Sequence, residues 1–322
     1  MASGERVHRT SHKWEIGAPA GVVHGLIADA ERWPLFLPCG VHVEVLDFDG
    51  NEERLRMWAT APGTSRCWTA RRFLDAARRR VDFRYEGQSG PVRAIDGVWQ
   101  VEERGPAACR LVLRHAFTVT GAAPGDGAET VRAVDSGIRA ALERLRSSAE
   151  RWTELDGLVL AFEDEIRVKG PAELVYDFLY RVGEWPGVVP HVARVELTED
   201  APGVQRLTTD TRGADGTLRT TEAMRVCFPH AGRIVHKETD TSALVAARTC
   251  DWQLVPDTRG VSVVCRQAVV VRDEAVEQIL GSGAGLAEAR RHLREELGRE
   301  ALAVLEPARD HAERAVRTIH MS

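Results

Sequence analysis

Three polar side chains stand among apolar ones in predicted β-strands, and their types suit ligand binding or acid–base chemistry inside a protein. Because side chains alternate across a strand, residues two apart share a face. Tyr85 and His115 each share a face with apolar residues two and four positions earlier. For Arg72 either face is possible, and we favour the face of Trp68, which places the guanidinium inside the protein. A buried charge of this kind needs an acceptor.

Each of these residues also has a purely structural interpretation. Arg72 can pair with an internal carboxylate or extend to the rim of a cavity. His115 can be a core histidine whose hydrogen bonds are satisfied. Aromatic residues of the same half could line an apolar cavity or pack as structure; they are Trp33, Trp58, Trp68, Phe83, Trp99 and Phe117.

An internal repeat organises the whole chain. The segment Trp33–Pro38 recurs as Trp185–Pro190, and other matches keep nearly the same offset along most of each half. We therefore expect a tandem duplication, with domains at residues 1–155 and 156–322. Under this alignment the pocket of the second domain would carry other polar groups; the corresponding residues are Arg225, His236, Glu238, Trp252 and Gln267.

The order of predicted elements is the same in both halves. A short strand, at Ser11–Ile16 or Ala161–Val168, leads to a proline that opens a helix, which the Trp-Pro pair is expected to end. Alternating segments follow, and a long amphipathic helix closes each half. Its apolar stripe should reach Trp152 in the first copy, and Pro307 should kink or end it in the second.

These elements predict an α+β fold with two tandem helix-grip domains. In each domain a curved antiparallel sheet would wrap around the long C-terminal helix and leave an interior pocket between them. Pockets of this kind are mostly apolar, with a few well-placed polar groups.

Composition excludes several classes of function. The 322 residues are 43% hydrophobic and 28% charged with a net charge of −5, which argues against broad nucleic-acid binding. Apolar runs are too short for a membrane span, and the first twenty residues lack a secretory h-region. The six cysteines form no C-x-x-C pair, so we expect free thiols in the cytoplasm and no metal site. Phosphate-loop and acyl-serine motifs are also missing from the sequence.

The repeated Trp-Pro segments and strand arginines resemble the di-domain aromatase/cyclases of bacterial type II polyketide synthases. These are also called bifunctional cyclase/dehydratases and belong to the START-like, Bet v 1-like superfamily. Single-domain relatives have a pocket arginine at the end of a W-x-x-x-R strand, and Trp68–Arg72 matches that spacing. The resemblance covers nearly the whole chain and rests on residues 31–36, 41–44, 68–72, 184–186, 190–197 and 220–230.

The resemblance implies a cofactor-independent polyketide cyclase/dehydratase that acts in antibiotic biosynthesis. Its substrate would be a poly-β-ketone held as a thioester on an acyl carrier protein, among the other components of the synthase. An intramolecular aldol reaction would close the first ring, and loss of water would aromatise it. Arg72 would stabilise negative charge on oxygen, and Tyr85 or His115 would move protons. Relatives place a tyrosine near Gly40, so that role is vacant here or taken by Tyr85.

Other possibilities stay open at this point. The second half could finish the dehydration with Arg225, His236 and Glu238, or only support the first half. The basic stretch Arg78–Arg80 with Arg84 is either a solvated turn or a docking site for the acidic carrier protein. The fold would equally suit a non-catalytic carrier of lipid or polyketide, or a regulatory module whose pocket is closed.

Overall fold

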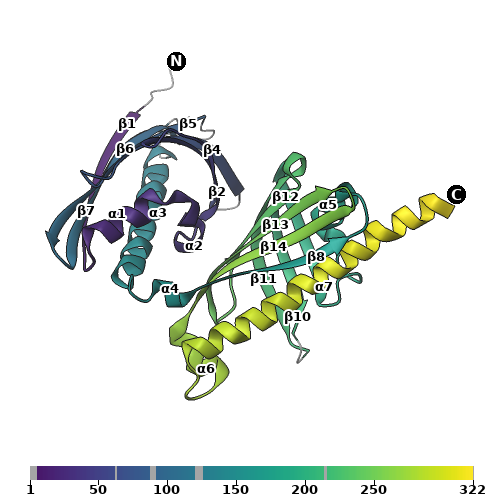
Figure 1. The fold of residues 1–322 in the computed structure, drawn as a ribbon. Coiled ribbons are helices and arrows are strands. Elements are labelled where there is room, and N and C mark those ends of the chain that lie inside the picture. The colour runs from purple at the N-terminus through teal and green to yellow at the C-terminus, as the bar shows by residue number, and fades with distance from the viewer. Residues whose placement is uncertain (1–5, 62–63, 88–91, 120–125, 214–215, 322) are drawn as a thin grey trace. The chain divides into compact units, whose positions relative to one another are not determined.

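The protein is described here by a computed structural model that covers residues 6–61, 64–87, 92–119, 126–213 and 216–321. The chain forms two compact units, Met1–Leu155 and Asp156–Ser322. Over the described residues, each unit is built on one seven-stranded antiparallel sheet (Figure 1). Two tandem domains of the α+β class are therefore present, as the repeat predicts.

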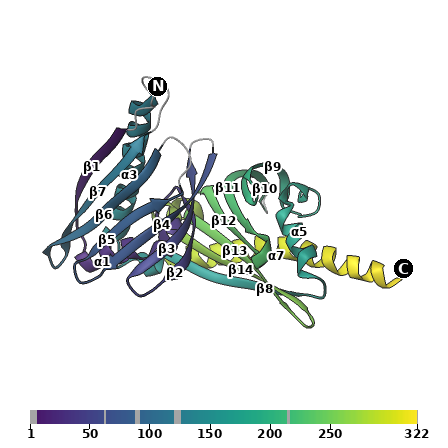
Figure 2. The same cartoon turned by 90° about the horizontal axis from the view of Figure 1, so that it is seen from above.

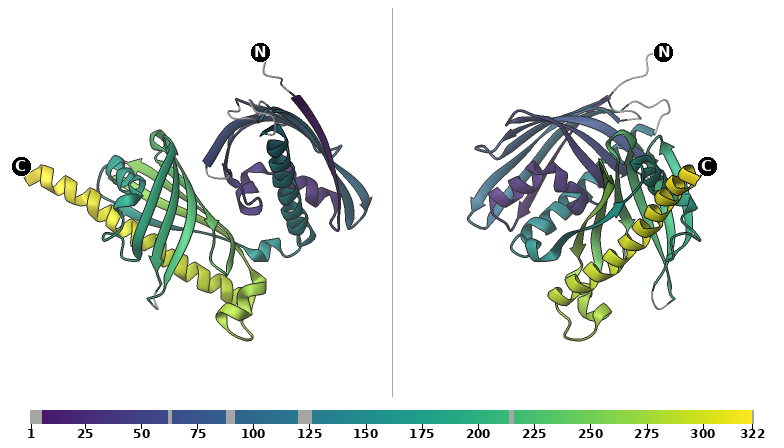
Figure 3. Two further views of the ribbon diagram at one scale, coloured as in Figure 1. Left: turned by 180° about the vertical axis from the view of Figure 1, so that it is seen from behind. Right: turned by 45° about the vertical axis from the view of Figure 1, so that its right-hand side comes forward.

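In the first domain the sheet arches over a long helix, and the shorter helices lie on the same concave side of the sheet (Figures 1 and 3). The strand order is β1-β7-β6-β5-β4-β3-β2, so the first and last strands of the domain pair. The strands are β1 (Arg6–Ile16), β2 (Gly40–Phe48), β3 (Glu52–Ala61), β4 (Thr64–Asp75), β5 (Arg80–Glu86), β6 (Val92–Gly105) and β7 (Ala108–Val119). The helices are α1 (Ala20–Ala28), the 3₁₀ turn η1 (Ala30–Arg32), α2 (Trp33–Phe36) and α3 (Asp126–Glu150), followed by α4 (Leu155–Leu158).

The second domain repeats this plan with the order β8-β14-β13-β12-β11-β10-β9 (Figure 2). Its strands are β8 (Val159–Val168), β9 (Val192–Ala201), β10 (Val204–Arg212), β11 (Leu218–Phe228), β12 (Arg233–Asp240), β13 (Val245–Asp257) and β14 (Gly260–Val271). Its helical elements are α5 (Ala172–Tyr180), η2 (Val182–Glu184), η3 (Pro229–Ala231), η4 (Asp273–Ala275), α6 (Val276–Leu280) and α7 (Leu286–Met321).

The stripe predicted for the first terminal helix is buried, but it ends earlier than expected. Leu142, Leu145 and Ala149 of α3 pack in one core with Ile16 and Leu111 of the sheet. Helix α3 ends at Glu150, and the Trp152 side chain is 44% exposed. The prediction that Trp152 belongs to the stripe is therefore wrong, because the chain turns away from the core before that residue.

One prediction about a proline is also corrected, and one alternative for another proline is excluded. Helix α1 ends at Ala28, and Trp33-Pro34 begins α2, since a proline in the first helical turn needs no N–H. Helix α7 does not end at Pro307 but continues to Met321. Leu305 and Ala308, on either side of that proline, are both fully buried in one core cluster, and this packing holds the helix together across the missing hydrogen bond.

Two features are absent from the described residues. No helix among them is long and apolar enough to cross a membrane. Among the same residues, no three His, Cys, Asp or Glu side chains gather in a way that could hold a metal ion.

Candidate active site

A cavity of about 870 Å³ lies within the first domain, between the curved sheet and α3. Six aromatic side chains from the sheet and α2 line it, and α3 contributes residues that include Ala133, Gly137 and Ala141. Of the residues predicted from the sequence, the wall contains Arg72, Tyr85, Trp33, Trp58, Trp68, Phe83 and Trp99. His115 and Phe117 are not part of it.

Arg72 is held at the end of a helix. Its guanidinium Nη2 donates to the carbonyl oxygens of Ile27, at 2.8 Å, and Ala28, at 3.0 Å, the last two residues of α1. A cation at this end of a helix meets carbonyls that lack partners within the helix. Nε lies 3.2 Å from Oε1 of Glu53, and the guanidinium carbon lies 5.0 Å from the ring centre of Trp33. The inward face predicted for Arg72 is confirmed, since the residue is 2% exposed.

Two nitrogens of this guanidinium make no hydrogen bond to the residues that the structure describes. Nε and Nη1 of Arg72 are both buried without such a bond, but Nε has an ion-pair contact with Glu53, whereas none is given for Nη1. Burial lowers the pKa of Arg72, while Glu53 raises it, and an arginine stays protonated through such changes. Arg72 is among the residues that line the cavity, so an unpaired donor of this guanidinium lies in the cavity wall.

Tyr85 stands beside Arg72 in the same wall. It pairs with Ala70 across β4 and β5, and its ring lies 5.6 Å from that of Trp68 and 5.4 Å from that of Phe83. Burial raises the pKa of Tyr85 to about 12, and the nearby Arg72 opposes that rise. The phenol is therefore protonated at neutral pH, which suits a proton donor rather than a base.

His115 lies on the inward face of β7 but in a different environment. Nδ1 of its ring is 2.9 Å from the hydroxyl oxygen of Thr10. The ring stacks between His12, at 5.8 Å, and Phe117, at 5.5 Å. Burial lowers the pKa of His115. These contacts are those of the structural alternative, a core histidine whose hydrogen bonds are satisfied.

The sequence analysis missed two features of this site. Glu53 was not singled out, although it shares a strand face with Leu55 and Met57 and stands opposite Arg72. Gly137 of α3 also faces the cavity, and a Cβ atom at this position would meet nothing within 4 Å. The strand alternation could have identified Glu53, whereas the identity of the helix wall requires the fold.

Comparison with known proteins identifies the family. A family model described as polyketide cyclase/dehydrase and lipid transport matches residues 16–146. The chain is 34% identical, over 310 residues, to the granaticin polyketide synthase bifunctional cyclase/dehydratase of Streptomyces violaceoruber, with 96% of this chain and 95% of that protein covered. It is 36% identical, over 311 residues, to the actinorhodin polyketide synthase bifunctional cyclase/dehydratase of Streptomyces coelicolor, with 94% and 96% covered. The chain belongs to the polyketide synthase bifunctional cyclase/dehydratase family.

Two solved structures match this cyclase/dehydratase over both domains. The di-domain ARO/CYC BexL has a TM-score of 0.86 at 39% identity, with 95% of this chain and 99% of that chain covered. The di-domain ARO/CYC StfQ, from the steffimycin biosynthetic pathway, has a TM-score of 0.84 at 29% identity and the same coverage. The predicted fold class and family are thus confirmed.

The second domain of the cyclase/dehydratase contains the same arginine arrangement with a different partner. Arg225 is 1% exposed, and its Nη2 donates to the carbonyl oxygen of Leu179 near the end of α5. Its Nη1 donates to Oε1 of Gln205, at 3.1 Å, and the guanidinium carbon is 5.8 Å from the ring centre of Trp185. Gln205 takes the place that Glu53 has in the first domain.

Charged side chains gather on the inner face of the second sheet. Arg248 of β13 donates to Glu238 at 2.7 Å, to Glu300 of α7 at 3.2 Å and to Gln267 at 2.9 Å. Gln267 in turn donates to the carbonyl oxygen of Leu297. Burial raises the pKa of Glu238, which the adjacent Arg248 opposes.

The two other predicted residues of the second domain have separate positions. Burial, followed by the charges of Arg248 and Arg225, lowers the pKa of His236 to about 3, so its ring is neutral near pH 7. Trp252 is 7% exposed and packs in the main core of the domain. The structure therefore brings Glu238 and Gln267 together around Arg248. Arg225 instead binds the helix end, and Trp252 packs in the core.

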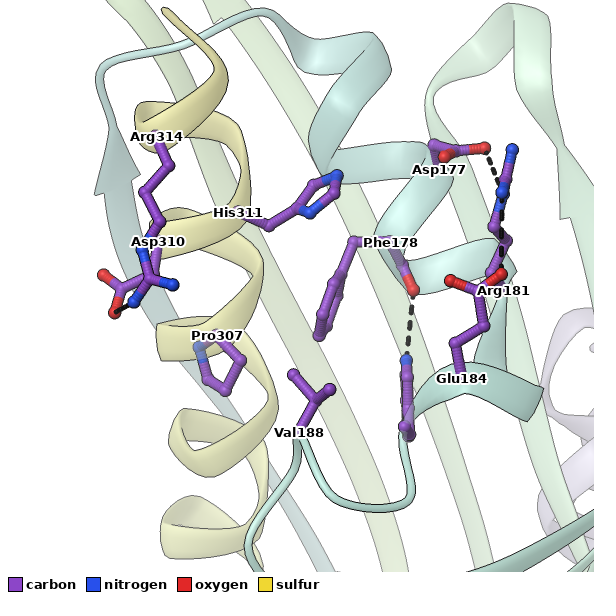
Figure 4. Close-up of a pocket in the computed structure, with 10 residues that line it drawn as sticks. Asp177, Phe178, Arg181, Glu184, Val188, Pro307, Asp310, His311 and Arg314 are labelled. Atoms are coloured by element: carbon purple, nitrogen blue, oxygen red, sulfur yellow. Dashed lines mark hydrogen bonds and ion pairs between the residues drawn. The ribbon is translucent and has the colours of Figure 1, made fainter. Parts of the chain in front are cut away.

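A smaller hollow of about 370 Å³ lies between α5 and the part of α7 around Pro307 (Figure 4). Phe178, Val188 and Pro307 face one another there, and ionised side chains surround them. The arginines at the rim already have partners, since Arg181 binds Asp177 and Glu184.

Proposed function

We propose that the first domain closes and aromatises the first ring of a poly-β-ketone, with Arg72 and Tyr85 as its catalytic residues. The observation that supports this proposal is that Arg72, whose Nη1 has no hydrogen-bond partner among the described residues, lines an aromatic cavity beside a protonated phenol. A volume of about 870 Å³ lies within the ~300–1,000 Å³ of ordinary ligand pockets.

In the first step, an enolate carbon of the substrate attacks a ketone carbonyl of the same chain. The new carbon–carbon bond leaves its electron pair on the carbonyl oxygen, and Nη1 of Arg72 donates a hydrogen bond to that oxygen. Tyr85 then gives the alkoxide a proton, so that the product is a tertiary alcohol. A positioned donor of this kind contributes about 10²–10³-fold to the rate.

In the second step, the alcohol leaves as water and a carbon–carbon double bond forms. The Tyr85 phenolate left by the first step takes a proton from the adjacent carbon, which produces an enolate whose oxygen Arg72 stabilises. Tyr85 returns that proton to the hydroxyl group, which departs as water, and the proton released when the first enolate formed restores the phenol. Further enolisation gives the aromatic ring without any oxidant. The aromatic wall fixes which carbons meet, and positioning supplies much of the acceleration.

The substrate would arrive as a thioester on an acyl carrier protein, and the turn before β5 is the proposed contact. Arg78 extends from this turn with 79% of its side chain exposed. Asp75, Glu103 and Asp82 already pair with Arg78, Arg79 and Arg80, respectively. Such exposed pairs are weak, so an acidic partner can compete for the arginines.

Reconstitution with a minimal polyketide synthase tests the proposal. The wild-type protein should yield the aromatised ring, whereas Arg72→Gln and Tyr85→Phe should yield mis-cyclised shunt products. Folding of each variant is checked by circular dichroism and thermal unfolding. Normal product from a folded Arg72→Gln protein would refute the role of Arg72, and binding of polyketide without any turnover would favour a carrier function.

A further inference from the structure

Glu53 has no role in the chemistry described so far, yet it is the buried carboxylate nearest to Arg72. It is 8% exposed, on the inward face of β3, and its Oε1 lies 3.2 Å from Nε of Arg72. Burial raises the pKa of Glu53, while Arg72 lowers it. A buried charge pair is weak support for stability by itself, so its presence calls for another explanation.

The second domain shows what the same arrangement does without the carboxylate. There, Gln205 accepts a hydrogen bond from Nη1 of Arg225. In the first domain, Glu53 instead lies at the Nε side of Arg72 as an ion pair without a hydrogen bond, and Nη1 has no hydrogen-bond partner among the described residues. In both domains Nη2 is used at the end of a helix. The two sites therefore differ in which guanidinium nitrogen the neighbouring side chain faces.

We propose that Glu53 is a positioning residue that attracts Arg72 at its Nε side and so leaves Nη1 without a protein partner, as a donor for the substrate oxygen. This inference rests on the proposed function of Arg72. The ring of Trp33, 5.0 Å from the guanidinium carbon, supports the same orientation from the other side. The helix-end carbonyls fix Nη2, and Glu53 decides how the remaining nitrogens are used.

The variant Glu53→Gln separates this role from a simple effect of charge. Removing a negative charge beside Arg72 would strengthen its attraction for an oxyanion and raise the rate. If the new amide oxygen instead accepts from Nη1, as Gln205 does in the second domain, that donor is no longer available to the substrate oxygen. We expect kcat for cyclisation to fall about 10²–10³-fold with KM changed only a few-fold.

The matched control is Gln205→Glu in the second domain, which should leave cyclisation by the first domain unchanged. Thermal unfolding gives the readout for a merely structural role. The Arg225–Gln205 pair shows that arginine and glutamine are compatible at these positions of the fold, so the Glu53→Gln protein should fold. If it does not, Glu53→Asp tests the same point, because the shorter side chain keeps the charge but withdraws it from Nε; its kcat should also fall.

The outcomes distinguish this inference from the proposed function. If Arg72→Gln abolishes cyclisation while a folded Glu53→Gln protein keeps or exceeds the wild-type kcat, the positioning role is refuted and the role of Arg72 stands. If Arg72→Gln itself retains the wild-type rate, the proposed function fails first. A lower melting temperature with unchanged kcat and product ratio would assign Glu53 to stability alone.

Discussion

In both domains an arginine of the fourth strand reaches the end of the first helix, but the space around that arginine differs. Arg72 lines a cavity and its Nη1 has no hydrogen-bond partner in the described part of the chain, whereas Arg225 gives the equivalent nitrogen to Gln205. The helix end thus explains why both copies carry the arginine, and the cavity explains why the first copy can use it in chemistry. Both copies therefore keep the contact between the arginine and the helix end, whereas the residues around the arginine differ.

The long helices of the two domains also differ in the residue that they place beside the sheet. Glu150 of α3 accepts a hydrogen bond from the backbone N–H of Gly17, and Glu313 of α7 accepts one from Lys169. These two equivalent contacts align the helices, and under that alignment Glu300 of α7 corresponds to Gly137 of α3. A glycine that leaves open space in the first domain is therefore replaced by a carboxylate that binds Arg248 in the second.

The largest effect is expected from removing each arginine in turn. Arg72→Ala should abolish cyclisation and lower the free energy of unfolding by about 3–5 kcal/mol, because Glu53 is left buried and unpaired. Arg225→Ala should cost about 1–3 kcal/mol, since its partners are neutral. Chemical denaturation and product analysis of both variants measure the difference. Equal losses of stability would contradict the contrast between Glu53 and Gln205.

The next largest effect on cyclisation is expected from a larger side chain on α3 where this helix lines the cavity of the first domain. Gly137→Phe should fill part of the cavity and slow correct cyclisation about 10²-fold through misplacement of the substrate. Gly137→Ala is the matched control and should stabilise the helix by about 0.5–1 kcal/mol with little change in product. An unaltered product spectrum from the phenylalanine variant would show that α3 does not border the reacting chain.

A smaller effect concerns acid sensitivity, which the second domain should have through His236. Its pKa is about 3 in the folded protein, compared with about 6.5 when unfolded, so between these values the unfolded state binds the extra proton. Stability should therefore fall as the pH drops through this range, by about 2 kcal/mol at pH 5. Glu238, whose pKa is raised by burial, titrates in the opposite sense.

The variant His236→Phe isolates this contribution, because phenylalanine is the residue at the equivalent position of the first domain, Phe83. Hydrogen exchange of β12 amides between pH 5 and 7 should show a weaker pH dependence in the variant than in the wild type. Identical profiles would mean that His236 does not lose its proton on folding.

The smallest effect on stability is expected from changing an exposed arginine at the proposed carrier-protein contact. Arg78→Glu should change the free energy of unfolding by no more than about 0.5 kcal/mol, because its pair with Asp75 is exposed. Binding of an acyl carrier protein should weaken and become less dependent on salt. Arg259→Glu, in an exposed turn of the second domain, is the control. Equal carrier affinity for both variants would remove the proposed contact.

Much of the architecture can be predicted from the sequence pattern. The strand alternation and the helical stripe depend on residues that are close together in the chain, and the repeat shows that the second half contains the same pattern. The inward faces of Arg72 and Tyr85 are predicted in this way. What surrounds them is not, since Glu53 and Gly137 come from other elements whose approach depends on sheet curvature. Pro307 shows the same limit: its effect on the backbone is local, but burial of Ala308 beyond it is tertiary.

The anchoring of Arg72 to the carbonyl oxygens of Ile27 and Ala28 has a consequence for redesign of this enzyme. A residue that binds a helix end and, in the proposed function, also activates a carbonyl tolerates few replacements, so β4 is a poor place to seek new ring patterns. Gly137 of α3 has neither of these two roles. Replacing it with side chains of increasing size can therefore change the shape of the cavity. Variation along that helix is the route by which products could diversify while the reactive centre stays intact.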